Sequence, residues 1–239
     1  MIQRVLMTAI IAGFIAGVFA SAAQSVKVIP LILEAETYET GTADAHDHGE
    51  ESHGAVAAET EAHSHDHDAG DWAPEDGLER TAFTLLSNVA AGVGFGLLLC
   101  GAIVLRGRDE DVKTGVLWGL AGFAAFSLLP ALGLPPEVPG TVAADLQARQ
   151  IWWFLTVACS AVGLALIFLK QGHIWTGLGV VLIAVPHIVG APHPDVPGGT
   201  VPPSLAAEFA VASLVSALLF WLVLGASTGW LYNRFNKSA

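Results

Sequence analysis

Histidines and carboxylates are concentrated in one stretch of the chain. Six of the nine histidines and 15 of the 22 acidic residues lie between Gln24 and Arg80. The histidines alternate with acidic and small residues in two clusters, His46, His48 and His53, then His63, His65 and His67. Imidazole nitrogens beside carboxylate oxygens suit late first-row divalent metals, including Co, Ni, Cu and Zn, and short histidine-rich tracts are a compositional signal of metal binding. The tract therefore predicts metal capture without identifying the metal.

The same stretch has a plainer interpretation as a solvated acidic linker, or as one that responds to pH through its histidines. Residues 43–76 contain almost no large apolar side chain before Trp72. Such a segment cannot bury enough surface to offset the entropy of ordering, so we expect it to be disordered without a ligand. Its acidic field would raise the local concentration of cations, which favours gathering ions over one fixed site.

Further candidate ligands stand at the ends of apolar runs: Glu34, Glu36, Glu39, His187, His193 and Glu208. On a helix, Glu36 and Glu39 share a face and suit an ion entrance, although a plain solvated helix end fits them equally. An ionisable residue at membrane depth is a functional candidate. His187 fits this best, with a hydrogen-bonded interface histidine as the alternative. Asp145 and Arg149 lie four residues apart, a spacing that favours a structural ion pair.

The elements that must position these residues are membrane spans. The chain is 53% hydrophobic and only 13% charged, against roughly 25% charged residues in soluble domains. A spanning helix needs about 20 apolar residues. Six runs qualify: residues 5–26 with an extension to 33, 82–105, 114–134, 151–169, 173–189 and 206–231.

The sequence thus predicts an all-α integral membrane protein, a bundle of about six transmembrane helices with a long disordered exterior loop. We expect a first transmembrane helix in residues 1–33, an exterior His/acid-rich loop in 34–80 and a five-helix transmembrane region in 81–239. The first run begins like a cleavable secretory signal. It continues past the small residues 20–23, however, so we expect a retained helix whose Lys27 reaches the headgroups.

Lysine and arginine positions set the orientation. With a cytoplasmic N-terminus and six spans, seven basic residues lie inside (Arg4, Arg106, Arg108, Lys113, Lys170, Arg234 and Lys237) and three outside (Lys27, Arg80 and Arg149). The positive-inside rule therefore places both termini in the cytoplasm and the histidine-rich loop outside. Glycine pairs four residues apart, such as Gly13/Gly17 and Gly115/Gly119, predict close helix packing in lipid.

Several function classes are excluded or unsupported. The sequence contains no phosphate-binding loop, no C-x-x-C, no H-E-x-x-H and no nucleophile elbow, so nothing in it predicts an enzyme. Its acidic balance of −12 argues against nucleic acid. Cys100 and Cys159 lie in apolar runs and are expected to pack as small hydrophobes. A haem- or quinone-linked subunit using His173 and His187 is disfavoured because helix rise separates them by about 20 Å.

Several stretches are distinctive when taken together. They are VIPLILEAETYE at 28–39, LWGLAGFAAF at 117–126, PALGLPPE at 130–137, ARQIWW at 148–153, VPHIVGAP at 185–192, AEF at 207–209 and GWLY at 229–232. In these stretches the chain resembles the CbtA family of predicted bacterial cobalt transporter subunits. The resemblance implies several membrane spans and cobalt uptake linked to cobalamin synthesis. It also implies a small partner, CbtB, with one span and a His-rich end.

Together these patterns predict a membrane subunit of a divalent metal transporter, with cobalt as the first choice of cargo and no tightly bound cofactor. The exterior loop would capture the ion for passage through the helices. The alternative is a non-transporting subunit that senses metal or scaffolds another transporter. We expect a bacterial plasma-membrane location and contacts with lipid and a CbtB-like partner, while homo-oligomerisation stays open.

Overall fold

The computed structural model describes residues 2–43, 74, 77–107, 111–196 and 198–237, with residues 39–43 and 237 described by their backbone alone. Its elements in chain order are α1 (Ile2–Val26), α2 (Val28–Ala43), α3 (Leu78–Arg106), α4 (Val112–Phe123), the π-helical turn η2 (Ala124–Leu128), α5 (Leu129–Ala131), α6 (Leu146–Leu169), α7 (His173–Val189) and α8 (Pro203–Lys237). Within the described residues, extended pairing is limited to one isolated bridge between Thr141 and Gly199. The all-α prediction is confirmed.

Five helical stretches in the described part of the chain are long and apolar enough to cross a membrane: 2–26, 78–106, 112–131, 146–169 and 203–236. The apolar helix α7 has only 17 residues, or about 26 Å of rise, close to the lower limit for a span. Most of its exposed side chains are apolar; Ile174 and Ile188, for example, are 77% and 81% exposed. An exposed apolar surface of this kind suits lipid, so the protein is an all-α integral membrane protein.

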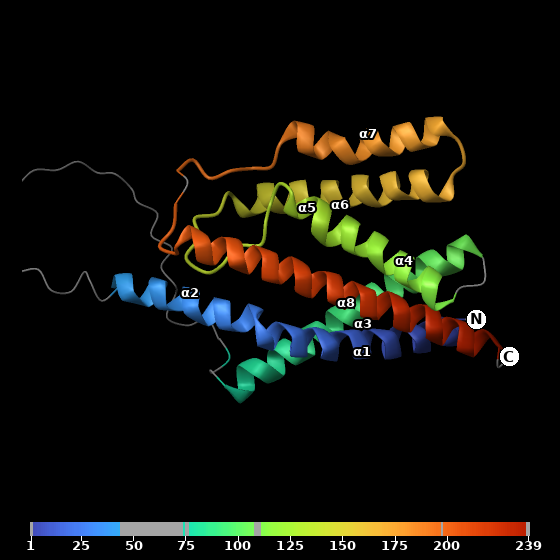
Figure 1. The fold of residues 1–239 in the computed structure, drawn as a ribbon, viewed down its shortest axis with the longest axis horizontal. Helices are drawn as coiled ribbons and strands as arrows, with labels where there is room; N and C mark the ends of the chain where they lie inside the picture. The colour runs from blue at the N-terminus through green and yellow to red at the C-terminus, as the bar shows by residue number, and fades with distance from the viewer. Residues whose placement is uncertain (1, 44–73, 75–76, 108–110, 197, 238–239) are drawn as a thin grey trace, which may run out of the picture.

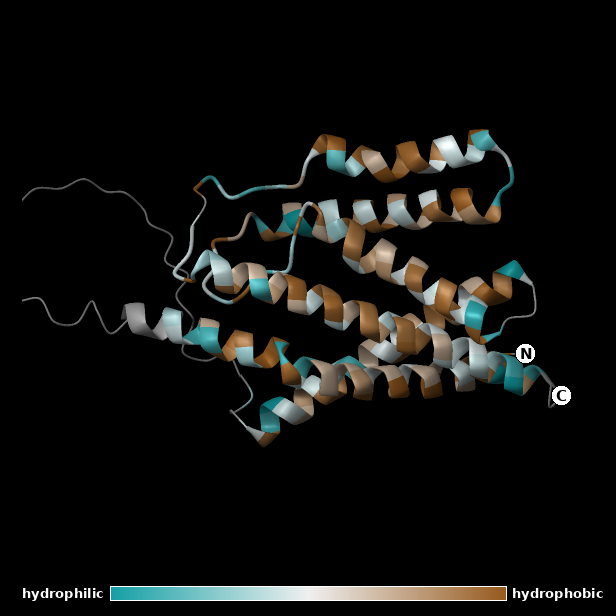
Figure 2. Ribbon diagram, in the orientation of Figure 1, coloured by the Kyte–Doolittle hydropathy of each residue, from teal (hydrophilic) through white to brown (hydrophobic). Residues whose placement is uncertain are grey.

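The helices run side by side along the long axis of the molecule (Figure 1). One end, called here the terminal end, holds both termini, the ends of α3 and α6 and the starts of α4 and α7. The opposite, distal end holds the end of α2, the start of α3 and the connections 132–145 and 190–202. Figure 2 shows hydrophobic residues along the middle of the helices and hydrophilic ones gathered near their ends.

The first span and α2 are separated by a break at Lys27. Pro30 has no N–H, so the carbonyl of Val26 loses its helical donor, and the helix restarts at Val28. The 25 residues of α1 rise about 38 Å, enough to cross a bilayer alone. The helix continues past residue 34, where the predicted exterior segment begins, to Ala43, beyond the length that a span requires.

Close glycine contacts hold the helices in pairs. Gly13 of α1 meets Gly92 of α3, and Gly115 of α4 meets Gly225 of α8, so closely that an added Cβ would overlap the opposite backbone. Asn88 adds a polar link, since its Nδ2 donates to Ser21 Oγ at 3.0 Å and to Gln24 Oε1 at 2.8 Å. The predicted close packing of the glycine pairs is confirmed.

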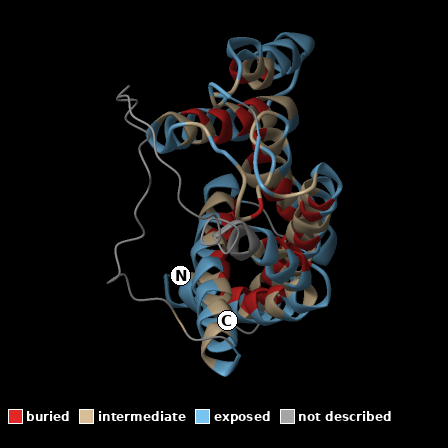
Figure 3. Ribbon diagram, turned by 90° about the vertical axis from the view of Figure 1, so that its left-hand side faces the viewer, coloured by how far each residue is buried: buried red, intermediate tan, exposed pale blue. Residues whose placement is uncertain are grey.

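Two buried clusters hold the helices together, and Figure 3 shows the buried residues among the packed helices, seen from the distal end. The larger one joins α1, α3, α4 and α8 around Ala12, Phe123, Trp221 and Leu224. The smaller one lies toward the distal end and joins α2, the 132–145 connection and α8: Val28, Leu31, Ala35, Val138, Leu205 and Phe209. This second cluster fixes α2 against the start of α8, and so gives the carboxylates of α2 a defined position.

Candidate functional site

Three ion pairs lie at the distal end, and each joins segments that are separate in the sequence. Lys27 pairs with Glu208, Arg80 with Glu36, and Arg149 with Glu137. The sequence predicted the acidic members as candidate ligands or loop residues but missed their partners. One signal in the sequence could have pointed to these pairs: basic residues are scarce near the acidic stretch. Arg80 is the one basic residue between Lys27 and Arg106.

The pair Glu36–Arg80 joins the two helices that flank residues 44–77. Both guanidinium nitrogens donate, Nη2 to Glu36 Oε1 at 2.5 Å and Nη1 to Oε2 at 3.2 Å. This two-pronged geometry is the stronger form of an arginine–carboxylate contact. The side chains are 32% and 35% exposed, so a cation arriving from water can reach the carboxylate but must compete with the guanidinium.

Glu208, in the second turn of α8, is paired with Lys27 at the break between α1 and α2. The two side chains are about half exposed, at 49% and 58%. The ammonium group of Lys27, which was predicted to reach the headgroups, thus neutralises a candidate ligand. An exposed pair of this kind contributes at most about 1 kcal/mol, which leaves Glu208 open to exchange.

The predicted pair between Asp145 and Arg149 is wrong. Arg149 Nη2 bonds Glu137 Oε2 at 2.5 Å, while Asp145 caps α6 by accepting from the Ala148 N–H at 2.8 Å. A carboxylate at the helix N-cap satisfies an unpaired backbone donor, and this use competes with pairing one turn further on. Asp145 therefore begins the helix, and Arg149 holds the preceding connection.

His187 lies in the last turn of α7, against Trp152 of α6. The two rings meet edge to face with centroids 5.8 Å apart, and Trp152 Nε1 donates to the Pro186 carbonyl at 3.2 Å. Within the described residues, His187 Nε2 is buried and has no hydrogen-bond partner. The imidazole thus keeps a ring nitrogen available, as a ligand or proton carrier requires.

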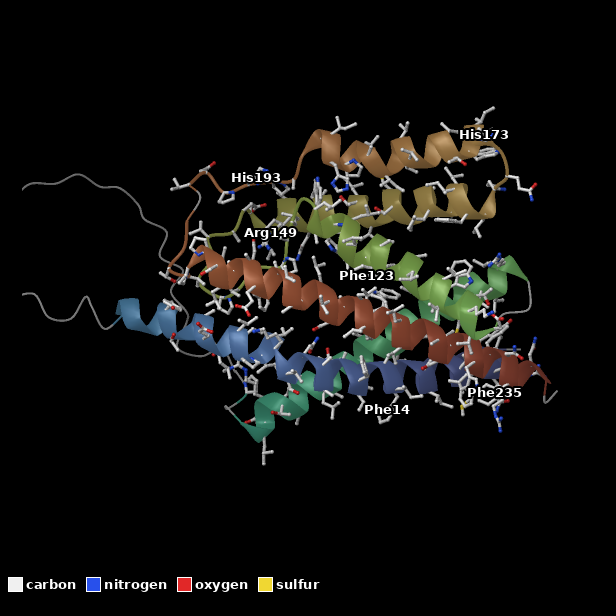
Figure 4. The ribbon with its side chains drawn as sticks, in the orientation of Figure 1. Phe14, Phe123, Arg149, His173, His193 and Phe235 are labelled. Carbon is white, nitrogen blue, oxygen red and sulfur yellow. The ribbon has the colours of Figure 1, made fainter. Side chains whose placement is uncertain are left out.

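The remaining candidates are spread apart. His193 lies exposed on the connection after α7 (Figure 4), and Glu34 is exposed on α2. His46, His48, His53, His63, His65 and His67 lie outside the described residues, as does the Glu39 side chain. Among the described residues, no group of three or more His, Cys, Asp or Glu side chains is arranged to hold a metal ion. The described carboxylates and histidines thus offer separate contact points for a cation.

His173 begins α7 at the terminal end, whereas His187 lies near the distal end of the same helix. Both are on one helix 14 residues apart, so helix rise separates them by about 21 Å. Axial ligation of one haem needs two histidines on opposite faces of the same ring. The arrangement does not support the redox alternative.

Comparison with known protein families shows which family the chain belongs to. A family model described as "probable cobalt transporter subunit (CbtA)" matches residues 2–233. The chain belongs to the CbtA family. No curated protein and no solved structure matches it. Membership in the CbtA family makes this a multi-pass membrane protein of a transporter class, and the word subunit implies that CbtA proteins act with a partner.

Proposed function

We propose that this CbtA-family protein is the membrane subunit through which divalent cobalt crosses a bacterial plasma membrane. The observation that supports this most directly is the match of the cobalt-transporter family over residues 2–233. The second supporting observation is that the described candidate ligands Glu34, Glu36, His187, His193 and Glu208 lie at the distal end of an apolar helical bundle. The chain crosses six times, with α7 as the shortest crossing, and both termini lie in the cytoplasm.

The distribution of charge supports this orientation. Elements at the terminal end carry Arg4, Arg106, Lys113, Lys170 and Arg234, whereas those at the distal end carry Lys27, Arg80 and Arg149. Basic residues favour the cytoplasmic side, so the distal end faces outward. The segment with six histidines connects α2 to α3, and both of these helix ends lie at the distal end. It would gather Co²⁺ on the outside, through imidazole and carboxylate ligands that exchange readily.

Captured ions would then pass from this segment to the distal carboxylates. Glu36 and Glu208 are each neutralised by a basic side chain, so a metal ion binds there only by displacing it. Such competition weakens binding, and weak binding helps conduction because an ion must leave each site as well as enter it. His187, deeper and with a shielded ring nitrogen, would receive the ion next.

A partner completes the transporter in this proposal. It is a small single-span protein with a His-rich end, as the sequence resemblance implies. Because this sequence contains no phosphate-binding loop for ATP, the partner would take part in coupling transport to an energy source. The competing proposal is a non-transporting subunit that senses metal or scaffolds a transporter. It is favoured by the absence of a three-ligand metal group among the described residues.

Uptake of radioactive Co²⁺ by cells separates these functions. Three proteins are compared: the intact protein, a variant that lacks residues 44–73, and His187→Ala. Each is expressed in cells that carry the partner gene and in cells that do not. His173→Ala is the matched control because it removes a histidine from the opposite end of the same helix. We expect the deletion to lower uptake several-fold at limiting Co²⁺ and little at saturating Co²⁺. His187→Ala should lower uptake at both concentrations, and His173→Ala at neither.

Uptake equal to that of cells without the protein would eliminate the transport proposal and leave the sensing or scaffold function. Uptake unaffected by the deletion at every Co²⁺ concentration would eliminate capture by the histidine-rich segment while leaving transport intact.

A further inference from the structure

The interface between α6 and α7 carries small and hydroxyl-bearing residues, as membrane helix interfaces commonly do, but one of its hydroxyls lacks a partner among the described residues. Trp152, Thr156, Ser160 and Gly163 are among the buried residues of α6, at spacings of four, four and three. This spacing places them along one stripe of the helix. The two ends of the stripe contact α7, Trp152 through the Pro186 carbonyl and Gly163 through Gly179.

Ser160 departs from the usual behaviour of a hydroxyl in a membrane helix. Such a hydroxyl normally bonds the carbonyl four residues earlier, as Thr156 does by donating to the Trp152 carbonyl at 2.8 Å. Ser160 is fully buried, and its Oγ has no partner among the described residues. An unsatisfied hydroxyl in hydrocarbon costs several kcal/mol, by order of magnitude. Thr8, Ser213 and Thr228 are the other hydroxyl residues in this state among the described residues, and Ser160 is the one on the helix that contacts His187.

α7 supplies a second polar feature at the same level. Pro186 lies inside the helix and has no N–H, so the Leu182 carbonyl loses its normal helical donor. Because Pro186 lies opposite Trp152 and Ile183 packs on Gly163, Leu182 falls opposite the stretch of α6 that contains Ser160. Interrupted helices with freed carbonyls are a recurring source of ion ligands in transporters.

Below Ser160, toward the terminal end, the interface is closed. A Cβ on Gly163 would lie 2.7 Å from the Gly179 carbonyl oxygen, and one on Gly179 would lie 2.6 Å from that of Gly163. Ile183 and Ile167 pack against the same two glycines. The unpartnered nitrogen of His187 and the hydroxyl of Ser160 thus both lie on the distal side of an apolar seal.

We propose that the distal half of the α6–α7 interface is a water-accessible passage for a partly hydrated divalent cation, entered at His187 and ending at Ser160. The imidazole nitrogen, the Leu182 carbonyl and the serine hydroxyl replace water ligands in turn. The Gly163–Gly179 contact closes the inner side. The identity of the cation as Co²⁺ rests on the proposed function, whereas the water access of Ser160 does not.

Cysteine modification in intact cells tests the passage. In a Cys100→Ala, Cys159→Ala background, Ser160→Cys is treated with a membrane-impermeant cationic thiosulfonate. Ser216→Cys is the matched control, because Ser216 is a buried serine of α8 away from this interface. We expect the thiol at position 160 to react several-fold faster than that at 216, and saturating Co²⁺ to slow the reaction at 160 alone.

Equal, slow modification at both positions in a background that still takes up Co²⁺ would overturn the inference and leave the proposed function standing. Fast modification at 160 that Co²⁺ does not slow would overturn the cation route. If the background fails to take up Co²⁺ while the native-cysteine protein succeeds, the cysteine substitutions have impaired it, and the modification rates still decide water access; failure of the native-cysteine protein would refute the proposed function. In the native-cysteine protein, Ser160→Ala should lower uptake several-fold and Ser216→Ala should leave it unchanged, and equal uptake by the two would count against the passage.

Discussion

Every basic side chain described at the distal end is bonded to a carboxylate from another segment. Lys27 thus links the α1–α2 break to α8, Arg80 links α3 to α2, and Arg149 links α6 to the connection that precedes it. A metal ion can bind the paired carboxylates only by displacing these basic side chains. Glu34, by contrast, is exposed on α2 and has no basic partner among the described residues.

At the terminal end, Asp111 caps α4. Its carboxylate accepts from the Thr114 N–H at 2.8 Å and from the Thr114 hydroxyl at 2.9 Å, and these bonds hold the pKa of Asp111 below its ordinary value. A lowered pKa means that the folded state favours the ionised form. Its stabilisation is complete above the unfolded pKa of about 3.9 and is lost as pH falls through the folded pKa.

We expect Asp111→Ala to lower the melting temperature of the detergent-solubilised protein at pH 7, because the cap is lost. Asp111→Asn keeps a capping oxygen and loses only the charge, so its deficit should be smaller and should shrink as the pH approaches 3. Melting curves at several pH values measure this. A difference between wild type and Asp111→Asn that grows on acidification would contradict the assignment.

Residue types and spacing predicted which side chains carry chemistry but not how they are partnered. The histidine clusters, His187 and Glu36 stand out in the sequence because polar groups are rare near apolar runs. The partners lie far along the chain: Glu36 pairs with Arg80, 44 positions away, and Glu208 pairs with Lys27. Only packing fixes such pairs. Ser160 was missed because a serine among apolar residues is ordinary until its hydroxyl is seen to lack an acceptor.

At the scale of elements, long apolar runs predicted the helices because lipid leaves the backbone no other way to satisfy its hydrogen bonds. The sequence allowed a helix end at Glu36 and Glu39 but did not predict its continuation to Ala43, since the threonines and glycine after Glu39 resemble a loop. It also did not predict the π-turn η2, where the Leu129 N–H bonds the Ala124 carbonyl five residues back. Pro130 removes the N–H that Phe126 would have received in a regular helix, which accounts for the change of register.

Glycine contacts are the most testable feature of the elements. Gly115→Ala would place a methyl group on the backbone of Gly225 and Gly229, and we expect it to destabilise the protein by about 1–3 kcal/mol, as overpacking does. Gly101→Ala is the matched control, because Gly101 lies within α3 with open space around it. Its stability should stay equal or rise slightly. Thermal unfolding in detergent measures both, and equal losses would show that the α4–α8 contact is looser than described.

For the whole molecule, the decisive question is which end faces outward. In the cysteine-free background, Pro135→Cys probes the distal end and Gln171→Cys the terminal end, since both residues are exposed in connections. An impermeant maleimide should label position 135 in intact cells and position 171 only after lysis. The reverse pattern would place the histidine-rich segment in the cytoplasm and end the capture proposal.

The single bridge between Thr141 and Gly199 has a consequence for motion. With the Val142 N–H donating to Gly198 and the Thr200 N–H to Gly140, it fastens the connection before α6 to the connection before α8. At the opposite end, α6 and α7 are joined by the chain to each other only. The α6–α7 hairpin is therefore held at its distal end, where this bridge joins the connections before α6 and before α8. A swing of the hairpin about this bridge would carry the Gly163–Gly179 contact with it as one piece and would open at the end of the molecule where both termini lie.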